Sequence, residues 1–140
     1  MNKTATVLDD IKVHVKLKIS AAWASVMFLY IYADYFGLYV PGALQHMLAG
    51  KMGPLGSTTQ IILLFTSAMI AIPSLMIFLT LVLKTSLNRW LNMLFGTLYT
   101  AIILITMWSW MFYIFYGIIE IGLTLLIVWY AWNWPRKPTK

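Results

Sequence analysis

The chain has 140 residues, of which 61% are hydrophobic and 10% are charged, and its mean hydropathy is +0.82. A soluble domain of this size could not bury so much apolar surface, so the composition excludes a soluble protein and predicts an all-α integral membrane protein. The chain contains no cysteine, which excludes disulfides, thiol nucleophiles and thiolate metal sites.

A basic tail, residues 1–18, precedes the first apolar segment. Within it, apolar and polar residues alternate from Ile11 to Lys18, and a period of two is typical of an extended segment. We expect this tail to lie on anionic headgroups at the cytoplasmic face of the lipid bilayer. A single membrane domain is predicted for residues 19–134, and a second basic cytoplasmic tail follows at residues 135–140.

Four apolar segments are each long enough to cross a bilayer as a helix, which takes about 20 residues. They cover about residues 19–39, 59–83, 90–108 and 113–132. Between the first two, the pattern of residues 41–57 predicts a short interfacial helix that ends at Gly50 and Gly53. Polar residues 84–89 and an aromatic turn at 108–112 form the other connections. Because these two connections are short, we expect a compact antiparallel four-helix bundle.

Pro73 lies near the middle of the second segment. Proline has no N–H to donate within a helix, so we expect a kink and one free carbonyl group there. Thr66, Ser67 and Gly96 are small residues of the second and third segments, and we interpret them as positions where helices pack closely.

The basic residues predict the orientation. Lys51 alone lies between the first and second segments, whereas the other nine basic residues fall on the opposite side. These nine are Lys3, Lys12, Lys16, Lys18, Lys84, Arg89, Arg136, Lys137 and Lys140. By the positive-inside rule both termini are cytoplasmic, and the loop at 41–57 is outside. This flanking role also accounts for the net charge of +6, so no nucleic-acid partner is predicted.

Two carboxylates, Asp34 and Glu120, lie inside the apolar segments, where no basic residue accompanies them. A carboxylate at bilayer depth costs at least about 2.5–3.5 kcal/mol, so its default interpretation is functional. At the rise of a helix, Asp34 lies roughly 7–8 Å and Glu120 roughly 10 Å below the outer edge of the membrane. Two acids on different helices at a similar depth predict one shared site near the outer leaflet.

Aromatic residues share the helical faces of both acids. Tyr30 lies one turn before Asp34, and Tyr113 and Tyr116 form a stripe with Glu120. Rings beside a carboxylate suit an organic cation. The sequence therefore predicts that these tyrosines form the walls of a ligand site.

His46 is the one imidazole on the side of the acids. A loop histidine is usually solvated, and His46 is a candidate partner of Asp34 or Glu120 only if the loop folds inward. The three residues would also match an oxygen and nitrogen ligand set for a metal. Because they lack close ligand spacing, neither a metal nor another cofactor is predicted.

Three states would make the two carboxylates tolerable in a membrane. They can be protonated, because burial favours the neutral form of an acid. They can pair with His46 or Lys51, or an external proton or amine can supply the missing charge. The first and third states are the two ends of one proton-coupled exchange cycle.

Three classes of function remain open at this point. The leading hypothesis is a protein that binds or transports a small molecule or cation through a proton-responsive site at Asp34 and Glu120; transport or conduction would favour a homo-oligomer. The alternative is a membrane enzyme in which the two carboxylates act as acid and base on a lipid-like or isoprenoid substrate. The third is an accessory subunit whose acids only form hydrogen bonds between helices.

Three stretches of the sequence are similar to an uncharacterised family of small four-span bacterial membrane proteins. They read KLKISAAWASVMFLYIYADYFGLYVPG, IPSLMIFLTLVLKTSLNRWLN and IEIGLTLLIVWYAWNWP. The resemblance covers about residues 8–135. It implies the four-span fold and a place in the bacterial inner membrane, and it implies no activity.

Overall fold

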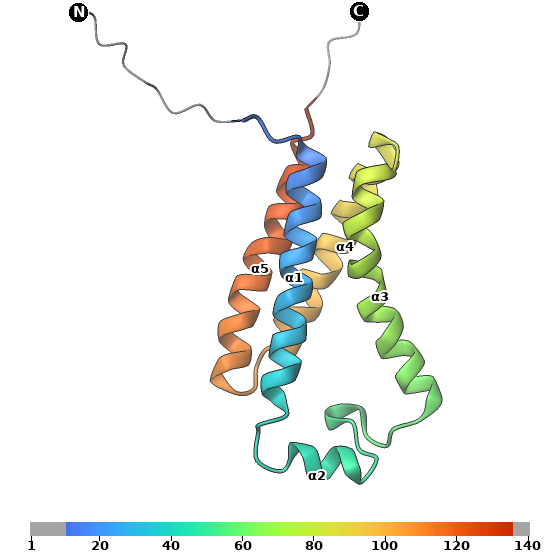
Figure 1. Ribbon diagram of the computed structural model, residues 1–140, viewed down its shortest axis with the longest axis vertical. Coiled ribbons are helices and arrows are strands. Elements are labelled where there is room, and N and C mark those ends of the chain that lie inside the picture. The colour runs from blue at the N-terminus through green and yellow to red at the C-terminus, as the bar shows by residue number, and fades with distance from the viewer. Residues whose placement is uncertain (1–10, 136–140) are drawn as a thin grey trace, which may run out of the picture.

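A computed structural model describes residues 11–135, which fold into a bundle of long helices (Figure 1). The elements are α1 (Val15–Gly37), α2 (Ala43–Leu48), the 3-10 turn η1 (Gly53–Leu55), α3 (Gln60–Val82), α4 (Thr85–Thr106) and α5 (Met111–Trp132). Four of these helices, α1, α3, α4 and α5, are long and apolar enough to span a membrane. The expected all-α architecture is confirmed, and the four long helices are consistent with the expected multi-pass membrane protein. The expectations for residues 1–10 and 136–140 lie outside the described residues.

Helix α1 begins within the basic tail, at Val15. Residues 11–14 precede the helix, and Nδ1 of His14 accepts a hydrogen bond from the Lys16 backbone N–H at 3.2 Å. Val15 and Ile19 are both buried, so the buried positions follow the helical period. The extended structure suggested by the alternating pattern was therefore wrong from Val15 onward.

The connection between α3 and α4 is shorter than the sequence predicted. Only Leu83 and Lys84 separate the two helices, and the polar residues from Thr85 onward belong to α4. The reason is that Asn88 and Asn92 are completely buried. These polar residues therefore lie in a hydrogen-bonded interior and not in a surface loop.

Helix α1 packs against both α3 and α5, and α4 packs mainly against α5, whereas α3 and α4 touch each other much less. In Figure 1 the start of α1, the end of α5 and the α3–α4 connection lie at the same end of the bundle, which we call the terminal end. Helix α2 and the α4–α5 turn lie at the opposite end, which we call the loop end (Figure 1). The weak contact between α3 and α4 leaves the bundle incompletely closed.

A buried polar network joins the helices in the terminal half. Trp23 is fully buried, and its indole N–H donates to Oδ1 of Asn92 at 2.7 Å. The Asn92 amide donates to Oδ1 of Asn88 at 2.7 Å, and the Asn88 amide donates to the Thr80 carbonyl at 2.5 Å. The Trp23 ring also meets Tyr99 edge-on at 5.9 Å between ring centroids. Because the polar groups of such a network satisfy one another, it fixes the relative position of the helices.

Two basic residues at the terminal end bind the carbonyl ends of neighbouring helices. The Lys16 ammonium donates to the carbonyls of Leu81 and Leu83 at 3.1 and 2.7 Å. Nε of Arg89 donates to the Ala131 carbonyl at 2.9 Å. Cations are favourable at helix C-termini, where carbonyl groups lack helical partners. These residues therefore stabilise the ends of α3 and α5.

The first half of α3, residues 60–72, leans away from the bundle toward the loop end (Figure 1), and we call it the splayed half. The buried residues of α3 are Pro73, Met76 and Thr80, all outside the splayed half. Pro73 has no N–H for the carbonyl four residues earlier, that of Met69. The Tyr99 hydroxyl of α4 donates to this carbonyl instead. As expected, the Met69 carbonyl has no hydrogen-bond donor within its own helix, and a residue of a neighbouring helix supplies the donor.

The packing role expected for Gly96 is confirmed. A Cβ atom on residue 96 would lie 2.7 Å from Cγ2 of Val128 and 3.3 Å from the Thr124 carbonyl oxygen, so the glycine lets α4 and α5 approach closely. Thr66 and Ser67 differ from the expectation. They belong to the splayed half, where Ser67 is exposed and the Thr66 hydroxyl donates to its own helix at Ile62.

Candidate functional site

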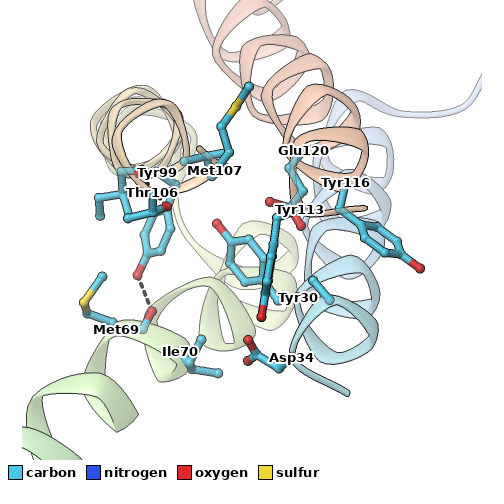
Figure 2. Close-up of a pocket in the computed structure, with 14 residues that line it drawn as sticks. Tyr30, Asp34, Met69, Ile70, Tyr99, Thr106, Met107, Tyr113, Tyr116 and Glu120 are labelled. Carbon is cyan, nitrogen blue, oxygen red and sulfur yellow. Dashed lines mark hydrogen bonds between the residues drawn. The ribbon is translucent and has the colours of Figure 1, made fainter. Parts of the chain in front are cut away.

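A cavity of about 270 Å³ lies among α1, α3, α4 and α5 in the loop-end half of the bundle (Figure 2). Its polar lining comes from Tyr30, Asp34, Tyr99, Thr106, Tyr113, Tyr116 and Glu120. Its apolar lining includes Met69, Ile70, Ile103 and Met107. Asp34 and Glu120, which the sequence placed at a similar depth on two helices, therefore line one cavity.

Glu120 is the buried acid of this cavity. The residue is only 5% exposed, and its Oε1 is the one buried side-chain oxygen or nitrogen in residues 11–135 that has no hydrogen-bond partner. Its backbone position is fixed, since the Thr124 hydroxyl donates to the Glu120 carbonyl at 3.0 Å and Thr100 donates to Thr124 at 2.7 Å. Buried polar atoms are almost always paired, so an unpaired oxygen on a carboxyl group that lines a cavity indicates a missing donor.

Asp34 lies at the mouth of the same cavity and is exposed. It also lines a wider space of about 700 Å³, which we call the α1–α3 gap. The gap is lined by Asp34, Met52, Thr66, Ser67, Met69, Ile70 and Ala71. Because Asp34, Met69 and Ile70 line both spaces, the cavity and the gap adjoin at these residues.

The rings of Tyr30 and Tyr113 lie between the two acids in Figure 2, and the Tyr113 hydroxyl points toward Asp34. This hydroxyl lies against Gly37, where an added Cβ atom would overlap it. Both tyrosines line the cavity that the two acids share.

Tyr116 is the predicted wall residue that fits least well. It borders the cavity, but its ring points away from both acids in Figure 2. It also borders a separate aromatic pocket of about 410 Å³, with Phe36, Tyr39, Val40, Trp110, Phe112 and Phe115. Tyr116 therefore lies at the margin of the candidate site.

No lysine, arginine or histidine is among the residues that line the cavity or the α1–α3 gap. His46 lies in α2 and is exposed. Its ring is close to Gly42, and His46 is not among the residues that line the cavity shared by the two acids. Lys51 is also exposed in the loop. Within the described part of the chain, no group of three histidine or acidic residues could hold a metal ion, so Asp34, His46 and Glu120 do not assemble into a metal site.

Sequence reasoning missed Tyr99 and Met69 as parts of the site. Both line the cavity, and the hydrogen bond between them joins α4 to the splayed half of α3. The signal was present in Pro73, because the carbonyl four residues before a helical proline requires a donor from elsewhere. A tyrosine on a neighbouring helix is such a donor.

The arrangement allows two kinds of chemistry at Glu120. Its unpaired oxygen can accept a hydrogen bond from a ligand N–H or O–H group. In its charged form, the carboxylate can pair with a cation that the faces of nearby aromatic rings also attract. The neutral form needs no cation, so a proton and a cationic ligand can replace each other at this group.

A model for a family of unknown function, DUF6326, matches residues 9–139 of the chain. The match covers nearly the whole sequence and agrees with the resemblance to an uncharacterised family of small membrane proteins. No curated protein and no solved structure matches the chain. The function must therefore be argued from the cavity.

Proposed function

We propose that this chain, which belongs to the DUF6326 family of unknown function, binds a small organic cation in the cavity between Asp34 and Glu120. The bound cation exchanges with a proton at the carboxyl groups. The loop end faces the outside of a bacterial inner membrane, and the basic terminal end faces the cytoplasm and its anionic headgroups. In this orientation the site opens near the outer leaflet.

The unpaired oxygen of Glu120 carries the proposal. Glu120 lines a cavity whose described lining contains no basic side chain, and its Oε1 is buried there without a hydrogen-bond partner. An ionised carboxylate that is buried without a partner is strongly unfavourable. A ligand ammonium group would supply both the missing hydrogen bond and the missing charge, and such charge-assisted hydrogen bonds are the strong ones.

The surroundings of Glu120 make the site responsive to protons. Besides Glu120, the titratable residues that line the cavity are Asp34 and Tyr30 from α1, Tyr99 from α4, and Tyr113 and Tyr116 from α5, and α3 contributes none. A carboxyl group cannot hold a proton and pair with an ammonium ion at the same time. Acid should therefore weaken cation binding, by up to about tenfold per pH unit for each proton released.

The first prediction concerns Glu120→Gln. This substitution keeps the size of the side chain and removes its charge, so binding of 2-phenylethylamine should weaken by about 10- to 100-fold, the loss of one charge-assisted hydrogen bond. Calorimetric titration of the protein in nanodiscs at about pH 6 and about pH 8 measures this, and the unmodified protein should bind more tightly at the higher pH. Asp10→Asn removes a carboxylate of the N-terminal tail, outside the apolar segments, so it is the matched control and should bind normally.

Unchanged binding in Glu120→Gln would contradict the proposed site. If the same variant also unfolded at an unchanged temperature, neither binding nor folding would need the charge of Glu120. That result would favour an accessory subunit whose acids only form hydrogen bonds between helices. Transport requires more than binding, namely a second opening toward the terminal end. Flux assays in proteoliposomes, with the oligomeric state measured beside them, address that step.

A membrane enzyme is the second candidate, because one observation favours it. Both carboxyl groups line a single cavity that adjoins the α1–α3 gap, and an acid and a base must reach the same substrate. In an enzyme, Asp34→Asn and Glu120→Gln would each abolish turnover of a lipid-like or isoprenoid substrate. A protein that only binds would give no product before or after substitution.

A further inference from the structure

We infer that the ligand is a lipophilic amine that reaches the cavity sideways from the bilayer, between α1 and the splayed half of α3. The inference rests on the proposed function and names the class of ligand and its route. It is carried by the position and lining of the α1–α3 gap and by the order of the two acids along the route.

The side of the bundle is open next to Asp34. Helix α3 buries residues only from Pro73 onward, and Leu64 in the splayed half is 72% exposed. Asp34 and Ile70 face the α1–α3 gap from its two sides and also line the cavity. A molecule dissolved in the outer leaflet could therefore move from the gap to the cavity without crossing a helix.

The segment from α1 to α3, including α2, runs along the loop end (Figure 1), and Met52 of this segment lines the gap. Backbone hydrogen bonds hold the loop in shape, from Met52 N–H to the Gly56 carbonyl and from Thr58 N–H to the Gly50 carbonyl, both 2.7 Å. The loop therefore borders the gap at Met52 and keeps a defined backbone shape there.

The two acids lie in an order that suits an amphiphilic cation. Asp34 is exposed at the mouth and Glu120 is buried farther in, so an ammonium group can pair with Asp34 before it reaches Glu120. The cavity of about 270 Å³ is just below the ~300–1,000 Å³ typical of sites for drug-sized ligands. The apolar body of a larger amine would therefore remain in the gap, beside Met52, Met69 and Ile70.

The test uses the full chain in nanodiscs and two primary amines, 2-phenylethylamine and ethanolamine. Both carry one ammonium group, and only the first has an apolar body. After correction for partition into empty nanodiscs, 2-phenylethylamine should bind at least about tenfold more tightly, because its ring is buried in the protein. Equal affinity for the two amines would overturn the assignment of a lipophilic ligand.

The route is tested with Ile70→Trp, which narrows the place where gap and cavity adjoin. Ile70 is 41% exposed, so a larger side chain does not disturb a packed core. Association of 2-phenylethylamine in stopped-flow mixing should slow by about tenfold or more, as expected when a bulky group obstructs the path. Leu64→Trp is the matched control on the same half-helix, outside both linings, and it should leave the rate unchanged.

A cysteine at position 70 gives a second measure of the route, since the chain has no cysteine of its own. The thiol of Ile70→Cys should react faster with a bilayer-soluble maleimide than with a membrane-impermeant one. Leu48→Cys in α2, where Leu48 is 83% exposed, should show the opposite preference.

The outcomes separate the two proposals. If binding depends on Glu120 but Ile70→Trp and Leu64→Trp behave alike and the thiol at position 70 prefers the impermeant reagent, the ligand enters from water. The route is then wrong and the proposed function stands. If neither amine shows binding that depends on Glu120, both proposals are wrong.

Discussion

The hydroxyl of Tyr113 lies directly against Gly37, so the absence of a side chain at residue 37 allows the ring to reach the space between the acids. Gly37→Ala should push this ring out of place. Loss of one ring beside the bound cation should weaken 2-phenylethylamine binding by about 0.5–2 kcal/mol, with little change in thermal stability. Titration of the variant in nanodiscs measures the effect.

Gly122→Ala is the control for this prediction. Gly122 is also helical, in α5, but a Cβ atom there would meet nothing within 4 Å. The change from glycine to alanine in the helix is the same, so Gly122→Ala should bind normally. Equal loss of affinity in both variants would show that helix flexibility, and not the position of Tyr113, controls binding.

Single residues were predictable from the sequence where depth and helical face decide the outcome. Asp34, Glu120, Tyr30 and Tyr113 share one cavity because two spanning helices place them at a similar level on inward faces. Tyr116 has the right spacing from Glu120, but its ring points away from the acids. Spacing gives the face of a helix, and the packing of its neighbours decides where the side chain points.

At the scale of the element, the middle of helix α3 accepts a hydrogen bond from α4. The Tyr99 hydroxyl donates to the Met69 carbonyl, which Pro73 leaves without a helical partner. Tyr99→Phe should therefore destabilise the protein by about 1–2 kcal/mol. In a Pro73→Ala background the new N–H can bond to Met69, so the same substitution should cost much less.

A double-mutant cycle in mixed micelles measures this coupling between Tyr99 and Pro73. Additive losses of stability would contradict the link between the proline and the tyrosine. Pro73→Ala alone should also slow the association of 2-phenylethylamine, because a straighter α3 would bring the splayed half closer to α1. Tyr99 and Pro73 would thus set the shape of α3, and this shape would control how easily the amine enters the cavity.

The number and nature of the spanning helices were predictable, and two of their features were not. The start of α4 at Thr85 depends on the buried bonds of Asn88 and Asn92, which the sequence shows only as polar residues beside Lys84. Pro73 predicts a bend in α3, but the separation of the splayed half from the bundle accompanies the small contact between α3 and α4. Both features arise from contacts between helices, and the periodicity of a single helix contains no information on such contacts.

For the whole molecule, the two ends of the bundle differ in charge and in structure. At the terminal end, Lys16 and Arg89 bind the carbonyl ends of α3 and α5. At the loop end the acids line an open cavity, and Lys51 is the only basic residue between the first two spanning helices. Two of the basic residues that predict the orientation therefore also stabilise the terminal half of the bundle.

This asymmetry predicts which end faces the outside of the cell. If the basic terminal end is cytoplasmic, a cysteine introduced at Leu48 in α2 should react with an impermeant maleimide on intact bacteria. A cysteine at Ser86, an exposed residue in the first turn of α4, should react only after lysis. Both sites are exposed, so a difference in labelling reports the side of the membrane and not burial.

The reverse pattern of labelling would place the cavity on the cytoplasmic side. The protons that compete with the amine for Glu120 would then come from the cytoplasm and not from the medium. Acidifying the medium should displace a bound amine from intact cells only if the loop end is outside. Labelling of Leu48→Cys and displacement by external acid must therefore agree, since both depend on the same orientation of the bundle.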